Sequence, residues 1–291
     1  MSRLKIPGKI FILLTALLWS TAGLCVKLLP WSALSITCVR GLLCGLLLLS
    51  VRLFKHPSQP VRFTKNNLTA GLCMFLTSSL YVMAIKLTTA ANAIVLQYIA
   101  PIVVLLYTIF VERKRPSGVE ILLTVIVFAG CVLTFLSKLE MGGMVGNLLA
   151  LLSGFALAGQ ILVNRKPDTV QQDGLLIGCG MSFVTFLPFL VTDAGFTVTP
   201  ATVGIGLFLG LVQYGLANLC FAKGIRTTDA ISASLLFTIE PILAPVWVFL
   251  SIGEAPAGTA VIGFLCVISA VTVHNIYPML VKKRSKAAYT R

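Results

Sequence analysis

Residues 84–102 read AIKLTTAANAIVLQYIAPI, and residues 224–242 repeat much of that pattern as GIRTTDAISASLLFTIEPI. At this shift of 140 residues two prolines and a glycine keep one register: Pro101 falls on Pro241, Pro116 on Pro256 and Gly118 on Gly258. Chance matches of Leu or Ala are common between apolar segments, whereas three such residues in one register are hard to obtain by chance. The pattern therefore predicts two related halves, at residues 1–138 and 139–291.

Both halves belong to a chain that is too apolar to fold in water. Of its 291 residues 57% are hydrophobic and 11% charged, and the mean hydropathy is +0.98, whereas soluble domains carry about 25% charged residues. This composition excludes a soluble enzyme, a DNA-binding protein and a disordered chain. Because a membrane span needs ~20 apolar residues, we predict an all-α integral membrane protein with ten spans, at residues 9–29, 33–54, 67–87, 91–111, 117–137, 144–164, 174–192, 201–222, 230–252 and 257–281.

The basic residues predict how these spans are oriented. Of the 23 Lys and Arg, Lys27, Lys86 and Lys138 fall on one side and Arg40 lies within a span, while all others fall on the side of the two termini. Because cytoplasmic loops are rich in Lys and Arg, we predict a multi-pass protein of the bacterial cytoplasmic membrane with both termini in the cytoplasm. The net charge of +14 thus reflects orientation, and we expect no nucleic-acid partner.

An odd number of spans in each half has a topological consequence. With five spans per half, the second half enters the membrane from the side opposite to the first. Such inverted repeats are typical of secondary transporters, whose substrate site lies near the bilayer midplane between the repeats. We therefore predict two inverted five-helix repeats around a central cavity.

The same residues carry a family resemblance. The segment TTAANAIVLQYIAPI in the first half, the run from Gly224 to Val271 in the second, LLWSTAGL at residues 17–24 and RGLLCGLLLL at residues 40–49 resemble the paired EamA domains of the drug/metabolite transporter superfamily. The resemblance implies ten helices around a central cavity and transport of small metabolites, often the export of amino acids or toxic analogues. The halves differ before the shared proline, where the first has Ala100 and the second Glu240, so we do not expect a symmetric substrate site.

Pro101 and Pro241 are the first candidate functional residues. A proline inside a helix removes one backbone hydrogen bond, and in a membrane such a break is tolerated where protein or a cavity satisfies the freed carbonyl. Both prolines are expected near the bilayer centre. One interpretation makes them gating kinks that line the cavity, and the other makes them features of packing alone.

Glu240 and Arg40 are the charged residues expected deep within spans, which marks a functional site by default. In one interpretation Glu240 is a proton carrier or a counter-ion for an amine, and Arg40 is its ion-pair partner or a clamp for a carboxylate. In the other, Arg40 extends toward the membrane surface and a protonated Glu240 binds neighbouring backbone.

Polar and aromatic residues at similar depth complete the expected cavity. They are Trp19, Tyr81, Gln97, Tyr98, Gln160, Gln213, Tyr214, Asn218, Phe237 and Trp247. Amides within spans usually face other helices, so interhelical bonding is the alternative for each amide. The pairs Gly41-x-x-x-Gly45 and Gly206-x-x-x-Gly210 favour internal packing over dimerisation, and Asp173 and Asp229 are expected to cap helices.

Together these patterns predict a secondary-active transporter that moves a small metabolite, such as an amino acid, an amine or a related amphipathic solute, by alternating access, most simply as an exporter. The alternatives are a flippase or accessory subunit for lipid-linked sugars and a polytopic membrane enzyme. No group of His, Cys or carboxylates has the spacing of a metal site, so no metal, cofactor or catalytic residue is expected, with proton coupling left open at Glu240. The expected partners are the small-molecule substrate and membrane lipids. We expect the protein itself to be a monomer or a weak homodimer.

Overall fold

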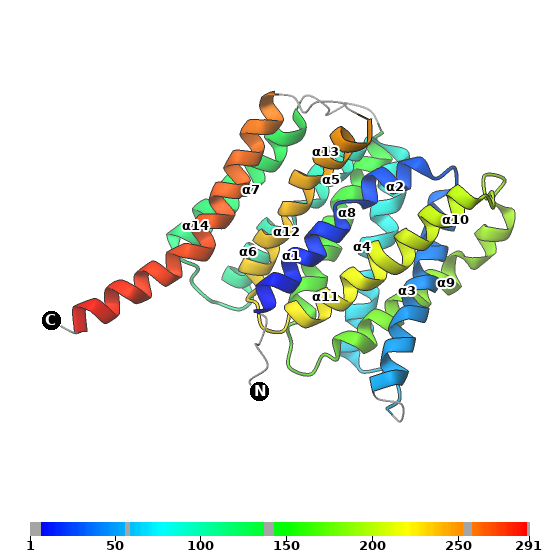
Figure 1. The fold of residues 1–291 in the computed structure, drawn as a ribbon. Coiled ribbons are helices and arrows are strands. Elements are labelled where there is room, and N and C mark those ends of the chain that lie inside the picture. Colours follow the sequence, from blue (N-terminus) through cyan, green and yellow to red (C-terminus); the bar gives the residue numbers. More distant parts are fainter. Residues whose placement is uncertain (1–6, 56–58, 137–142, 253–257, 290–291) are drawn as a thin grey trace.

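The computed structural model describes residues 7–55, 59–136, 143–252 and 258–289, and the regular elements in these parts are all helices (Figure 1). Along the chain they are α1 (Gly8–Trp19), α2 (Ala22–Leu28), α3 (Ala33–Lys55), α4 (Lys65–Leu87), α5 (Ala90–Gln97), α6 (Ala100–Phe110), α7 (Gly118–Phe135), α8 (Met144–Val163), α9 (Gln171–Thr192), α10 (Pro200–Leu207), the π-helix η2 (Phe208–Leu216), α11 (Ala217–Gly224), α12 (Ala230–Phe237), α13 (Ile239–Ile252) and α14 (Gly258–Tyr289).

These helices are long and apolar enough to make a multi-pass membrane protein. Eight segments of the described chain meet the length and hydropathy of a span: Gly8–Leu28, Ala33–Phe54, Lys65–Leu87, Asn92–Phe110, Met144–Val163, Gln171–Thr192, Pro200–Gly224 and Ala230–Ser251. The two other predicted spans correspond to the shorter apolar helices Gly118–Leu133 and Val261–His274. α1 begins and α14 ends toward the same side of the bundle, the lower side in Figure 1.

Four of the apolar segments are not single α-helices. The first divides into α1 and α2 at Ser20 and Thr21, Asn92–Phe110 divides after Gln97, and Ala230–Ser251 divides at Thr238. Pro200–Gly224 instead contains the nine-residue π-helix. Prolines explain two of the breaks, because Pro101 and Pro241 stand in the first turn of the helix that follows each break and supply no N–H to the preceding one.

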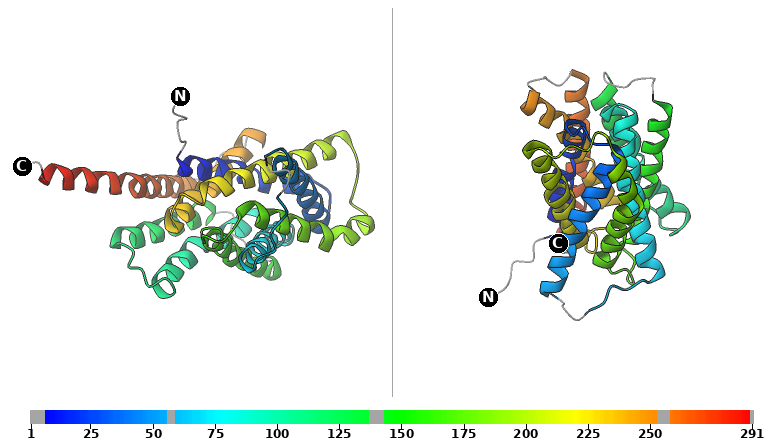
Figure 2. Two further views of the ribbon diagram at one scale, coloured as in Figure 1. Left: turned by 90° about the horizontal axis from the view of Figure 1, so that it is seen from below. Right: turned by 90° about the vertical axis from the view of Figure 1, so that its right-hand side faces the viewer.

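Helices from the two halves interleave in the bundle (Figure 2). α4 packs against α8 and α9, α3 against α9 and η2, α1 against α11 and α12, and α7 against α14. Glycines permit the closest crossings: a Cβ on Gly41 of α3 would lie 3.0 Å from the carbonyl oxygen of Cys179 on α9, and one on Gly210 would meet Leu43 at 2.5 Å. Glycines of both Gly-x-x-x-Gly pairs thus serve contacts inside this chain, as predicted.

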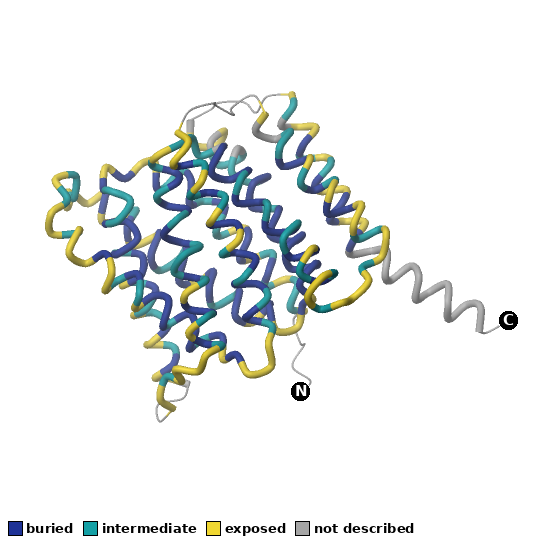
Figure 3. The backbone as a smooth tube through the Cα atoms, turned by 180° about the vertical axis from the view of Figure 1, so that it is seen from behind, coloured by how far each residue is buried: buried dark blue, intermediate teal, exposed yellow. Residues whose placement is uncertain are grey.

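Apolar side chains also cover the outside of the bundle, as expected where helices face lipid. Val184, Leu250 and Leu265 are each more than 60% exposed, and many other Leu, Ile, Val and Phe side chains are exposed as well. In Figure 3 the buried positions face the interior of the bundle, while exposed positions follow its outer faces and ends. A soluble protein rarely exposes so much apolar surface.

The two aspartates expected to cap helices have different roles. Asp229 caps α12, since its carboxylate accepts a hydrogen bond from the N–H of Ser232 at 2.8 Å. For Asp173 the prediction was wrong: it lies in the first turn of α9, forms a buried ion pair with Arg52 of α3, and accepts a hydrogen bond from the N–H of Arg62. Sequence position alone cannot distinguish a cap from a tertiary ion pair at the start of a helix.

Candidate substrate cavity

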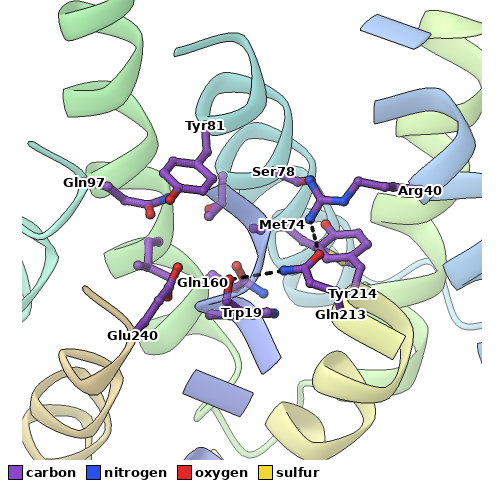
Figure 4. A pocket seen from close by; sticks show the side chains of 13 residues that line it. Trp19, Arg40, Met74, Ser78, Tyr81, Gln97, Gln160, Gln213, Tyr214 and Glu240 are labelled. Carbon is purple, nitrogen blue, oxygen red and sulfur yellow. Dashed lines mark hydrogen bonds between the residues drawn. The ribbon is translucent and has the colours of Figure 1, made fainter. Parts of the chain in front are cut away.

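A cavity lies inside the bundle, where the broken segments approach α3, α4, α8 and η2 (Figure 4). Its lining consists of Trp19, Ala22, Arg40, Met74, Thr77, Ser78, Tyr81, Gln97, Leu157, Gln160, Gln213, Tyr214 and Glu240. The space is small, with a volume of about 40 Å³, which is room for a few water molecules. A metabolite therefore enters only when some of these side chains move apart.

Trp19 supplies the aromatic side of the cavity from the end of α1. Its ring stacks on Phe237 with centroids 5.3 Å apart and on Phe221 at 6.0 Å. The neighbouring break at Ser20 is held from the second half, because the Trp247 Nε1–H donates to the Ser20 hydroxyl at 2.7 Å. The break beside Trp19 is thus fixed by α13.

Arg40 extends from α3 into the cavity and is only 4% exposed. Its Nη2–H donates to Oε1 of Gln213 at 3.1 Å, and its guanidinium carbon lies 4.4 Å from the ring centroid of Tyr214, a cation–π contact. Within the described parts of the chain no carboxylate forms an ion pair with Arg40, whereas Arg52 pairs with Asp173 and Lys114 with Glu112. The Arg40–Glu240 ion pair that one interpretation of the sequence allowed is therefore not formed, because the two residues line different walls of the cavity (Figure 4).

Glu240 belongs to a hydrogen-bonded group at the break between α12 and α13. The hydroxyl of Tyr98 lies 2.7 Å from the carbonyl oxygen of Phe237 and 2.8 Å from Oε2 of Glu240. In a continuous helix the N–H of residue 241 would serve the Phe237 carbonyl, but Pro241 has none. A carbonyl can only accept, and a tyrosine hydroxyl has one hydrogen. Both contacts are therefore full hydrogen bonds only when Glu240 carries a proton and donates it to Tyr98.

The other predicted residues, apart from Trp247 at the Ser20 break, fall into three groups. Tyr81, Gln97, Gln160, Gln213 and Tyr214 line the cavity together with Trp19, Arg40 and Glu240. Tyr98 and Phe237 stand directly behind the lining, where they contact Glu240 and Trp19. Asn218 is buried and its amide donates to the Tyr214 carbonyl one turn earlier, so it bonds within its own segment.

Pro101 and Pro241 form breaks rather than simple kinks. α5 ends at Gln97 and α6 starts at Ala100, so Gln97, which lines the cavity, is the last helical residue before the break at Pro101. Glu240 lies two residues after Thr238, the break in the second half. Each proline thus places a polar side chain of its own half at the cavity.

Sequence reasoning missed the lining residues of α4, and it gave no sign of the π-helix that holds the two predicted residues Gln213 and Tyr214. Gln213 and Tyr214 lie on η2, and π-turns within α-helices are frequent at functional sites, but no residue pattern in this segment indicates one. Met74, Thr77 and Ser78 come from α4. The run Thr77–Ser79 is an unusually polar stretch within an apolar span. This pattern could have indicated that α4 contributes to the cavity lining.

Comparisons with known proteins agree with this architecture. The model of the EamA-like transporter family matches the chain twice, over residues 6–136 and 144–276. The chain belongs to the EamA-like transporter family. Two similar proteins are an uncharacterized transporter, YwfM, of Bacillus subtilis (strain 168), 28% identical over 96% of this chain and 97% of its own, and the uncharacterized inner membrane transporter YicL of Salmonella typhimurium (strain LT2), 26% identical over 97% and 98%.

The fold of this EamA-family chain also matches a solved crystal structure. The TM-score is 0.79, and the match covers 91% of this chain and 96% of the other at 16% sequence identity. At this identity the match supports the fold alone. Family membership and the two relatives make the protein a membrane transporter of the EamA family, and the resemblance drawn from the sequence is confirmed.

Proposed function

We propose that this EamA-family protein is a secondary-active transporter that moves a small metabolite, such as an amino acid, an amine or a related amphipathic solute, across the bacterial cytoplasmic membrane by alternating access, as an exporter. The cavity carries this proposal: Arg40 from the first half and Glu240 from the second are both buried there, at 4% and 5% exposure, beside interrupted helices. Buried charges at broken spans are the usual form of a transporter's binding site.

Ten spans in two inverted repeats, residues 1–138 and 139–291, are part of the proposal. The packing of the helices supports it, because the contacts of one half recur when the halves are exchanged. The contact of α4 with α8 corresponds to that of α11 with α1, and the contact of α4 with α9 to that of η2 with α3. The contacts α3–α9 and α7–α14 correspond to themselves, as expected for helices beside a pseudo-twofold axis.

Alternating access requires one closable junction on each side of the cavity, and two related close contacts support this arrangement. A Cβ on Gly146 of α8 would lie 2.9 Å from the backbone nitrogen of Thr88, and a Cβ on Gly8 of α1 would lie 2.9 Å from the carbonyl oxygen of Gly224. Gly8 and Gly146 match in the sequence repeat at a shift of 138. Opening one junction while the other stays closed would expose the cavity to one side at a time.

The hydrogen bonds of Glu240 favour proton coupling. Protonated Glu240 completes a chain from its own carboxyl through Tyr98 to the Phe237 carbonyl, and loss of the proton leaves one hydroxyl hydrogen for two acceptors. Protonation therefore changes the bonding of the helix break itself. A proton gradient could drive the solute through this link.

The remaining parts of the proposal concern orientation and assembly. The distribution of Lys and Arg supports cytoplasmic N- and C-termini. A monomer or weak homodimer fits the use of Gly41 and Gly210 in contacts within the chain. A flippase for lipid-linked sugars is less favoured, because Arg40 is the one Lys or Arg in the described cavity lining and an anionic headgroup would need several.

Counterflow in proteoliposomes tests this function. Vesicles containing the purified chain are loaded with an unlabelled amino acid or amine, and uptake of the same labelled compound is measured with and without a pH gradient. We expect exchange that depends on the protein and accumulation that depends on the gradient. Export is tested by release of preloaded solute from cells that express the chain, and protein-independent movement for every compound would contradict the proposal.

A further inference from the structure

Arg40 has more hydrogen-bond donors than the protein satisfies. A guanidinium carries five N–H groups and accepts none. Nη2 donates to Gln213, while Nε and Nη1 are buried and have no hydrogen-bond partner among the described residues. Burying a charge without a counter-charge or full hydrogen bonding is costly. An acceptor that binds Nε and Nη1 of Arg40 would therefore be stabilised in this cavity.

A second hydrogen-bond donor without a partner lies on the neighbouring cavity wall. Trp19 Nε1, which can only donate, is also buried without a partner and lines the same cavity. Gln213 is already engaged, since its Oε1 accepts from Arg40 and its amide points to the Trp19 carbonyl at 3.5 Å. Figure 4 shows Arg40, Gln213 and Tyr214 grouped on one side of the cavity, with Glu240 on another.

Glu240 does not supply the missing negative charge. Its Oε2 is bonded to Tyr98, and that geometry is complete when the carboxyl is protonated. With Glu240 neutral, Arg40 is the one charged side chain of the cavity lining. The cavity then has a net positive charge, unpartnered N–H donors and the aromatic surface of Trp19.

We propose that Arg40 binds the carboxylate of the transported solute, so that the substrates are small organic acids, including amino acids, in which the carboxylate is essential and an ammonium group is not. This inference rests on the proposed transport function and narrows it, because simple amines are excluded. A carboxylate is planar and has two acceptor oxygens, which suits a guanidinium better than any neutral group does. The apolar part of the solute would lie against Trp19.

Two matched series of compounds test the inference without any mutation. The first is phenylalanine, 3-phenylpropionate, phenylalaninamide and phenethylamine; the second is leucine, 4-methylpentanoate, leucinamide and 3-methylbutylamine. Binding to the purified chain in lipid nanodiscs is measured from ligand-induced thermal stabilisation. We expect the acids to bind at least ~10-fold more tightly than the matching amides and amines, with or without the ammonium group. Equal binding of acid and amide, or no stabilisation by any of the eight compounds, overturns the proposal.

Variants then assign the effect to Arg40. Arg40→Gln should abolish the preference for acids, and Arg40→Lys should keep the preference with weaker binding, because an ammonium group retains the charge but lacks the planar fork. Arg226→Gln, an exposed arginine outside the cavity lining, is the control and should bind as the wild type does. If Arg40→Gln does not fold, the inference is judged from the binding of the two compound series to Arg40→Lys and to the wild type. An unchanged preference in a folded Arg40→Gln overturns the proposal.

The same compounds in counterflow separate this inference from the proposed function. Acids that bind but are never exchanged across the proteoliposome membrane would contradict transport and leave the carboxylate site intact. Exchange of phenethylamine and 3-methylbutylamine at the rate of the acids would leave transport intact and overturn the carboxylate site.

Discussion

Tyr98 donates a hydrogen bond from its hydroxyl to the backbone carbonyl of Phe237, 2.7 Å away and 139 residues later in the chain. Phe237 lies four residues before Pro241, so this carbonyl is the one that the proline leaves without a helical donor. A side chain from the break between α5 and α6 thus replaces the donor that is missing at the break between α12 and α13. Any movement that separates the two breaks must open this bond.

Tyr98→Phe should therefore weaken the link between the breaks while keeping the ring in place. Leaving a buried carbonyl without its donor costs about 1–3 kcal/mol, so we expect a lower thermal midpoint in nanodiscs and slower counterflow. Tyr107→Phe is the matched control, because Tyr107 is a half-buried residue of α6 outside the cavity lining. Equal midpoints for both variants and the wild type would show that the bond contributes no stability.

Pro101→Ala and Pro241→Ala should each lower the transport rate without preventing folding. Alanine restores an N–H four residues after Gln97 or Phe237, which favours a continuous helix across the break. A continuous helix would withdraw Gln97 or Glu240 from its place in the cavity lining.

The control for the prolines is Pro188→Ala, because Pro188 lies inside α9 at an exposed position outside the cavity lining. Rates are measured by counterflow, and folding by the elution profile and thermal midpoint. Wild-type rates in both cavity variants would make the prolines features of packing alone.

The sequence predicted the elements that depend on local pattern. Apolar runs located the membrane segments, and the prolines located two of the breaks. Both features could be predicted because each depends only on a few residues that are neighbours in the sequence. Arg40 and Glu240 stood out because charged residues are costly within a span. Eight of the residues that the sequence singled out line the cavity.

Features that depend on the angle around a helix or on contacts across the bundle were not predictable in this way. Depth along the spans suggested an Arg40–Glu240 pair, but depth does not say which wall a side chain occupies. The break at Ser20 depends on Trp247 of the other half, and the bond from Tyr98 to Phe237 joins two distant segments. The π-helix that holds Gln213 and Tyr214 has no residue signature in the segment.

The position of the C-terminus gives a prediction about topology. With both termini cytoplasmic, a green fluorescent protein fused after Arg291 should fluoresce, and an alkaline phosphatase fused there should be inactive. The reason is that fluorescent protein matures in the cytoplasm, whereas the phosphatase needs the oxidising periplasm for its disulfides. Active phosphatase and a dark fluorescent fusion would contradict the ten-span topology.

The buried ion pair between Arg52 and Asp173 should matter for stability and not for binding. Arg52 also donates to the carbonyls of Gln59 and Pro60, and the side chains of the pair are 7% and 1% exposed. Removing one partner of such a pair typically costs about 3–5 kcal/mol.

We therefore expect Asp173→Asn to lower the thermal midpoint clearly. Lys114→Gln, which breaks an ion pair whose lysine is 67% exposed, should have little effect because surface pairs contribute about 0–1 kcal/mol. Equal changes in the two variants, or loss of ligand binding in a folded Asp173→Asn, would contradict this assignment.

Glu240→Gln separates the structural role of this residue from its proposed role with protons. The glutamine amide can donate to Tyr98 as a protonated carboxyl does, so the chain from residue 240 through Tyr98 to the Phe237 carbonyl is preserved. We therefore expect a thermal midpoint close to that of the wild type. Glu112→Gln, which changes a carboxylate outside the cavity lining, is the matched control.

Transport by Glu240→Gln should divide into two parts, because glutamine cannot ionise. Accumulation driven by a pH gradient should be lost, since no proton can be released when the solute leaves, whereas counterflow at equal pH on both sides should persist. Both are measured in proteoliposomes with the same labelled solute. Gradient-driven accumulation at the wild-type level would show that Glu240 is not the proton carrier. Loss of counterflow together with accumulation would instead assign Glu240 to solute binding, because exchange needs a bound solute but no proton movement.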